Sequence, residues 1–266
     1  MNIFNTKLLK IRRNAIAKHL KDHNFFRVEI LSRIVERIDE IKQSFPNVLE
    51  IGSSIGELSE VLHNNPKITH ITQTDIACNV LKHNNQSGNK LVVDPNMPLP
   101  FKDKSFDMVI AVLSLHQVNN LLDAFKEIYR VLKPNSPIIT VFPTYGSLQS
   151  LGQALYETEM NLYNIFSPRM HPLSDIKTLG NLLQKANFSE IVADQDSIEV
   201  MYKNVPQIFK DLKYNNENNI LLKQNTKVMP KDFFLEVEKT FEKFIDTESK
   251  HYPVKVEFAN LIAWKV

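Results

Sequence analysis

The chain of 266 residues is 43% hydrophobic and carries a formal net charge of +2, which allows one substantial core and a small cap. No block of basic residues with interleaved aromatics occurs, so we expect no nucleic-acid partner. The single cysteine, Cys78, excludes an internal disulfide framework and fits a reducing compartment. The longest apolar stretch, residues 108–115, is too short to cross a bilayer, so we expect no transmembrane segment.

The first 21 residues are basic and contain no Asp or Glu. They have two interpretations: a transit peptide for an organelle, or a basic arm that belongs to the fold. The segment lacks the serine richness of a transit peptide, which favours the arm. Because Asn, Lys and Ile are abundant, as in proteins of AT-rich genomes, we expect a bacterial, cytoplasmic protein, with the mitochondrial matrix as the alternative.

Apolar residues at helical spacing predict an amphipathic helix over 28–41. The first strand, 47–51, stops at Gly52, and a helix starts at Glu57 beyond the loop. Further strands are expected over 68–74, 91–93, 106–113 and 138–142, and further helices over 76–83 and 120–133. This alternation predicts a parallel sheet covered by helices on both faces.

The second half is less regular. Helices are expected over 148–163 and 174–186, with Ser174 as N-cap of the latter, and long strands over 191–202 and 254–266. Between these strands, residues 205–250 are expected to be mostly helical around an Asn-rich loop at 215–219.

We therefore expect a single α/β domain over 1–266, a Rossmann-like sheet with helices on both faces, a helical insertion near the C-terminus and an antiparallel strand near the end. Its parts would be an N-terminal arm and helix (1–45), a cofactor-binding core (46–145), and substrate-side helices with the final antiparallel strands (146–266).

The loop from Gly52 to Gly56 indicates a nucleotide-type ligand. Strand, glycine loop, helix, strand and acid follow one another, ending at Asp75. Glycines let the backbone approach a ligand, and a helix N-terminus presents free N–H groups. Asp75 is placed to accept hydrogen bonds from a ribose.

Ser54 in this loop has two interpretations. The sequence reads G-x-S-x-G, the nucleophile elbow of serine hydrolases. That elbow requires an upstream glycine cluster for its oxyanion hole, and no glycine precedes Gly52. Alternatively, Ser54 and Glu57 form an S-x-x-E capping box, so that Ser54 caps the helix and does no covalent chemistry. We favour the cap.

Four segments resemble the successive motifs of class I S-adenosylmethionine-dependent methyltransferases: LEIGSSIG, TQTDIA, VVDPNMPLPFKDKSFDMVIAVLSLHQV and EIYRVLKPNSPI. The resemblance extends to the ends of the chain. NIFNTKLLKIRRNAIA, FSPRMHPLSDIKTLGNLLQKANF and NLIAWK are similar to segments of the mitochondrial complex I assembly factor 5 family. Bacterial relatives of that family include malonyl-acyl-carrier-protein methyltransferase-like proteins.

The resemblance implies S-adenosylmethionine as cofactor and assigns its contacts. The loop glycines would line the methionine part, Asp75 would take both ribose hydroxyls, and Ile76 would pack on the adenine. Asp94 would face the adenine amino group, and Ser114 would lie under the cofactor. The implied cofactor-binding residues are Gly52, Ser53, Ser54, Gly56, Asp75, Ile76, Asp94 and Ser114. The family has glycine where Ser54 stands. The Cβ of Ser54 would therefore crowd the cofactor unless the side chain faces away.

Three further residues are candidates for the acceptor side. His116 follows the fourth strand and would lie near a transferred methyl group, where it is a candidate base. Arg169 and His171 lie between prolines in an expected rim loop and are candidate substrate contacts. No Cys/His set has the spacing of a metal site, so we expect no metal.

Three functions follow from the resemblance. The first is methyl transfer to a protein or acyl-carrier substrate. The second is arginine hydroxylation of a complex I subunit on the same fold, since the assembly-factor family is associated with that reaction. The third is a non-catalytic binding scaffold.

Overall fold

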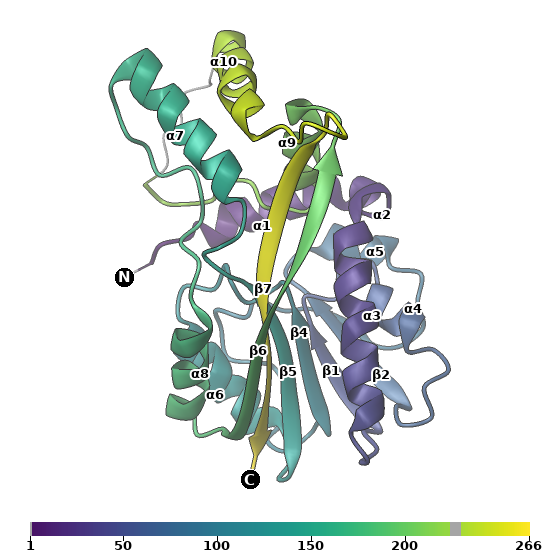
Figure 1. The fold of residues 1–266 in the computed structure, drawn as a ribbon. Coiled ribbons are helices and arrows are strands. Elements are labelled where there is room, and N and C mark those ends of the chain that lie inside the picture. The colour runs from purple at the N-terminus through teal and green to yellow at the C-terminus, as the bar shows by residue number, and fades with distance from the viewer. Residues whose placement is uncertain (1, 224–229) are drawn as a thin grey trace.

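The computed structural model describes residues 2–223 and 230–266, which form a seven-stranded sheet with helices on both faces (Figure 1). The strand order is β3-β2-β1-β4-β5-β7-β6. The strands are β1 Asn47–Ile51, β2 His70–Asp75, β3 Lys90–Val92, β4 Met108–Val112, β5 Ser136–Pro143, β6 Ser189–Tyr202 and β7 Tyr252–Lys265. The predicted α/β sheet is confirmed.

Strands β1 to β5 are parallel, and β7 lies antiparallel between β5 and β6. The expected antiparallel strand near the C-terminus is therefore present. Because the parallel strands run in one direction, their carboxyl ends meet at one edge of the sheet, which is where open α/β sheets bind ligands. Ile51, Asp75 and Val112 end three neighbouring strands at this edge.

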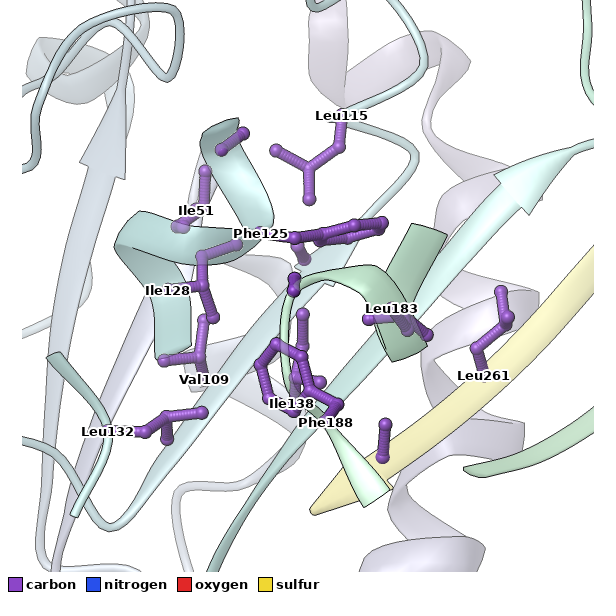
Figure 2. Packing of buried hydrophobic residues seen from close by; sticks show 14 of the residues in the cluster. Ile51, Val109, Leu115, Phe125, Ile128, Leu132, Ile138, Leu183, Phe188 and Leu261 are labelled. Atoms are coloured by element: carbon purple, nitrogen blue, oxygen red, sulfur yellow. The ribbon is translucent and has the colours of Figure 1, made fainter. Parts of the chain in front are cut away.

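Two apolar layers cover the sheet. On one face pack α3 (Phe25–Glu40) and α4 (Glu57–Val61), and on the other pack α6 (Leu121–Val131) and α8 (Ile176–Lys185). Figure 2 shows Phe125 of α6 and Leu183 of α8 in the second layer. All five residues of β4 are buried, as its nearly unbroken apolar run requires of a central strand.

Strands β6 and β7 continue beyond the edge of the sheet into a helical cap (Figure 1). The cap consists of α7 (Gln149–Tyr163), α9 (Val205–Tyr214) and α10 (Lys231–Phe241), followed by a 3-10 helix at Glu242–Phe244. These helices enclose a separate apolar core around Leu151, Ile208, Phe233 and Val254. The predicted helical insertion is thus present, although residues 224–229 of that expectation lie outside the described residues.

The basic N-terminal segment is also helical, which the sequence pattern did not indicate. It forms α1 (Thr6–Ile16), a 3-10 helix at Ala17–His19 and α2 (Leu20–His23). The apolar side of α1 packs over Ile76 and Val80 at the start of α5 (Cys78–His83). The segment therefore crosses the carboxyl edge of the sheet and does not project from the fold as a free arm.

One expected helix cap is wrong. Ser174 does not cap α8; the N-cap is Asp175, whose carboxylate accepts from the backbone N–H of Thr178 at 2.8 Å. A carboxylate at this position also opposes the positive end of the helix dipole, so it caps at least as well as a serine. Among the described residues, we find no helix long and apolar enough to span a bilayer.

Candidate cofactor and substrate site

Both glycines of the loop after β1 are required by its geometry. Gly52 has φ +77°, and a Cβ there would lie 2.2 Å from the Cβ of Ser114. Gly56 has φ +93°, and its Cβ would meet the Asn84 side chain at 2.4 Å. L side chains rarely adopt such φ values, and no space exists for them here. Gly52 therefore lets the end of β1 approach the residues after β4, and Gly56 lets the loop approach the residues after α5.

Ser54 is neither a helix cap nor an elbow nucleophile. The N-cap of α4 is Gly56 and not Ser54, so no side chain caps this helix and the predicted capping box is wrong. The hydroxyl of Ser54 instead lies 3.3 Å from Oε1 of Glu57, a carboxylate rather than an imidazole. Ser54 has φ +53°, the left-handed conformation that favours glycine, which explains why the family's loop has glycine here.

Asp75 is the best-coordinated side chain of the site. It ends β2, is 1% exposed, and accepts four hydrogen bonds. Arg13 of α1 donates to both carboxylate oxygens, at 2.8 and 2.7 Å. The backbone N–H of Ala77 donates to Oδ1 at 2.9 Å, and that of Ser54 to Oδ2 at 3.2 Å.

The space at the carboxyl edge beside Asp75 is small. Its cavity has a volume of about 50 Å³ and is lined by Arg13, Gly52, Asp75, Ile76 and Ser114 together with neighbouring apolar residues. Pockets that enclose drug-sized ligands have volumes of about 300–1,000 Å³. The residue types therefore fit a nucleoside cofactor, but in this conformation the side chain of Arg13 takes the place that the ribose would need.

Four of the eight predicted cofactor residues line this cavity: Gly52, Asp75, Ile76 and Ser114. Ser53, Ser54, Gly56 and Asp94 do not, and Ser54 instead lines a larger cavity beneath the cap. Ser114 donates from its hydroxyl to the Ile51 carbonyl at 2.7 Å beneath the loop. Ser53 is buried beside it, its amide bonded to the Thr74 carbonyl. Asp94, by contrast, does not line this cavity, and its Oδ1 accepts from the backbone and side chain of Asn96 in a turn. Gly56 also stays outside the lining, where it shapes the loop.

A second cavity, of about 410 Å³, lies between the sheet edge and the cap. Its walls are apolar residues of α7, α9 and α10, including Leu151, Phe209 and Phe233. The two segments expected to form the acceptor wall, the loop with Arg169 and His171 and the helical insertion, both line it. The structure thus places them around one common space.

His116 and His171 meet across Glu217. Nε2 of His116 lies 3.1 Å from Oε1 of Glu217, and Nδ1 of His171 lies 3.8 Å from Oε2. Burial by itself would raise the pKa of Glu217, but the charge and hydrogen bond of His116 lower it below its ordinary value. Burial lowers the pKa of His171, so this ring is neutral, and its Nε2 accepts from the Ile220 backbone N–H at 3.3 Å.

These three side chains could hold a cation. Their ligand atoms lie within 4.8 Å of one another. The prediction of no metal spacing rested on local sequence patterns, which cannot reveal donors from three distant segments. Glu217 was missed because nothing in the Asn-rich loop around it marks a functional carboxylate.

A buried acidic network lies behind the glycine loop and was also missed. Glu50 of β1 and Glu57 of α4 share one guanidinium, that of Arg27 from α3, at 3.0 and 3.5 Å. Arg27 also donates to the carbonyls of Val112 and Gly52. Burial, with a smaller contribution from Glu57, raises the pKa of Glu50 to about 8 despite the attraction of Arg27. One proton therefore remains in this cluster at neutral pH.

Arg169 is part of the cap's interior and not a solvated rim residue. Its Nη2 donates to Oε1 of Glu159 at 2.6 Å, and Glu159 in α7 is 1% exposed. The guanidinium also lies over the ring of Phe233 of α10, 4.8 Å from its centroid. Arg169 therefore joins two helices of the cap, and its first role is structural.

Comparison with known proteins agrees with this geometry. A methyltransferase domain matches residues 49–140. A solved phosphoethanolamine N-methyltransferase 2 of Haemonchus contortus, in complex with S-adenosyl-L-methionine, superposes with a TM-score of 0.55 at 15% identity, over 89% of this chain and 52% of that one. The fold is that of the S-adenosylmethionine-dependent methyltransferases, a methyltransferase domain matches its core, and S-adenosylmethionine is the cofactor of that class.

The particular family follows from relatives that match the entire chain. The mitochondrial arginine-hydroxylase NDUFAF5 of Rattus norvegicus is 30% identical over 270 residues, covering 100% of this chain and 78% of its own length. The chain belongs to the NDUFAF5 family. It is also similar to malonyl-[acyl-carrier protein] O-methyltransferase 1 of Coxiella burnetii, 28% identical over 71% of this chain and 64% of that protein.

The interior position of Arg169 yields a stability prediction. Arg169→Ala leaves the carboxylate of Glu159 buried without its guanidinium, so we expect a loss of about 3 kcal/mol in the free energy of unfolding. Urea denaturation measures it. Arg169→Lys should lose less, and Glu159→Gln added to Arg169→Ala should recover part of the loss. An Arg169→Ala variant as stable as the wild type would show that this ion pair does not stabilise the cap.

The raised pKa of Glu50 yields a pH prediction. Glu50 keeps its proton in the native state up to about pH 8, whereas in the unfolded chain it releases the proton above its ordinary pKa of 4.5. The contribution of this protonated group to stability is therefore full below pH 4.5 and is lost as pH rises toward about 8. Glu50→Gln cannot ionise, so its melting temperature relative to wild type should rise between about pH 5 and about pH 9. Glu40→Gln, at an exposed position of α3, is the control. Parallel curves for Glu50→Gln and wild type would contradict the assignment.

Proposed function

We propose that the protein transfers the methyl group of S-adenosylmethionine to a group on a protein or acyl-carrier substrate that enters the 410 Å³ cavity. The observation that supports this most is the adjacency of the two cavities. Arg13 and Leu113 line both the small space at the sheet edge and the larger cavity under the cap. A cofactor held at the edge would therefore present its reactive end to a substrate in the larger cavity.

On this proposal, the chain's own residues bind and orient. Asp75 would hold the ribose hydroxyls, Ile76 would pack against the adenine, and the backbone at Gly52 would lie along the methionine part. The cofactor supplies a methyl group already activated on a sulfonium, so positioning supplies much of the rate. The apolar walls of the cap exclude water from the place of transfer.

The larger cavity offers an apolar wall for the stem of a long side chain. Its lining is mostly aliphatic and aromatic, and its charged lining residues are Glu57, Asp211 and Glu217 together with Arg13, Arg27 and Arg169. An arginine of a protein substrate has an apolar stem with a charged end, and the relatives that match the whole chain are named arginine-hydroxylases. We therefore favour a protein substrate over an acyl carrier, which the Coxiella burnetii relative represents.

A second candidate function is hydroxylation of such an arginine. The cluster of His116, Glu217 and His171 favours it, since two histidines and one carboxylate form the donor set of non-haem iron(II) oxygenases. The donor set fits only with rearrangement. Nε2 of His171 accepts from Ile220, so its Nδ1 carries the proton, which an ion at that nitrogen would have to displace.

Product mass distinguishes the two reactions. We would incubate the protein and S-adenosylmethionine with a purified arginine-containing subunit of complex I and, separately, with malonyl-acyl carrier protein, with and without iron(II), dissolved O₂ and a two-electron reductant such as ascorbate. Hydroxylation requires the last two because one oxygen atom of O₂ enters the arginine and the other leaves as water, with two electrons from the reductant. A product heavier by one CH₂ supports methyl transfer, and one heavier by a single oxygen supports hydroxylation. If both substrates keep their mass under all conditions, both proposals fail for these substrates.

Cofactor affinity tests the assignment of Asp75. Asp75→Asn removes the charge that would strengthen the hydrogen bonds to ribose, and we expect binding of S-adenosylmethionine to weaken by about 2–3 kcal/mol in calorimetry. Asp103→Asn, at a side chain that is 71% exposed, is the matched control and should bind as wild type does. Equal titration of wild type and Asp75→Asn would show that Asp75 is not the ribose ligand.

A further inference from the structure

The N-terminal helix carries an internal competitor for the ribose acid. A carboxylate offers about four acceptor sites, and those of Asp75 are taken by two N–H groups of Arg13 and two backbone amides. The backbone amides belong to the loops themselves and stay with the fold. Arg13 alone comes from another segment, so ribose hydroxyls can reach Asp75 only where this guanidinium leaves.

On the proposed assignment of Asp75 as the ribose ligand, we propose that Arg13 is a side-chain latch over the cofactor site, and that its guanidinium occupies Asp75 until the cofactor's ribose displaces it. The 50 Å³ space beside Asp75 is the closed state of that site. Because Arg13 forms a bidentate pair whose carboxylate is fully buried, closure has a defined geometry and is not a loose surface contact.

The backbone of α1 is held to the fold on both sides of Arg13. Asn14 accepts from the N–H of Asn79 in α5 at 2.8 Å, and Arg12 donates to the Asn219 carbonyl at 2.6 Å. Leu9 and Ile16 of the same helix are buried in an apolar cluster. The helix therefore stays in place, and only the side chain of Arg13 moves away from Asp75.

Arg13 can reach other carboxylates once it is displaced from Asp75. It also lines the larger cavity, where Glu57 and Glu217 are the other carboxylates within its electrostatic reach. Glu217 follows α9, close in sequence to Asn219, to which Arg12 is bonded. Displacement from Asp75 would thus bring the Arg13 guanidinium toward these two carboxylates in the larger cavity.

The test uses 5′-methylthioadenosine, which has the adenine and ribose but no carboxylate that could bind Arg13 itself. If a closed state dominates in the free protein, Arg13→Ala should tighten its dissociation constant by about tenfold in calorimetry. Lys10→Ala removes an exposed charge from the same helix and should leave the affinity unchanged. Arg13→Lys, which keeps the charge but not the fork, should fall between wild type and Arg13→Ala. Unchanged or weaker binding by Arg13→Ala would overturn the proposal.

A second measurement uses the wild-type protein and does not depend on the folding of Arg13→Ala. The Nε–H of Arg13 donates to Oδ1 of Asp75, so saturating 5′-methylthioadenosine should speed hydrogen exchange at this Nε–H, followed by NMR. Slower or unchanged exchange there would mean that the ligand does not displace Arg13, and the proposal would be wrong.

Discussion

The site depends on the close approach of Gly52 to Ser114. It sets how near the end of β1 approaches the end of β4, and a single added carbon at residue 52 would fill that gap. The hydroxyl of Ser114 then bonds the last carbonyl of β1 across the same gap. The position of the glycine loop, and through it that of Asp75 and Ser54, depends on this approach.

Three acidic side chains are buried together at the site. Glu50, Glu57 and Asp75 are all buried around one loop, and their partners Arg13 and Arg27 both come from the N-terminal segment. Buried carboxylates are tolerated only when paired or protonated, and here both solutions occur. Arg13 and Arg27, both within the first 40 residues, therefore supply the positive charges that allow these carboxylates to be buried.

The central sheet could be predicted because its signals are local. The run from Met108 to Val112 is apolar throughout, and Gly52 ends β1 abruptly, so periodicity and a glycine mark both elements. Glu217 and Arg13 could not be found this way, since each acquires its role from residues more than 40 positions away. Ser54 shows a different limit: the S-x-x-E pattern fits a capping box, but the left-handed backbone at Ser54 turns its hydroxyl to the Glu57 side chain.

Strands β6 and β7 form a long antiparallel ribbon, which has a mechanical consequence. Its pairing runs without a break from Val192 opposite Ile262 in the sheet to Tyr202 opposite Tyr252 in the cap. Leu261 belongs to the core of the sheet and Val254 to that of the cap, so one stiff ribbon spans both. A hinge between sheet and cap would have to bend this ribbon against its ladder of hydrogen bonds. The ribbon therefore fixes the spacing between the sheet and the cap on either side of the larger cavity, to whose wall it contributes Val200 and Val254.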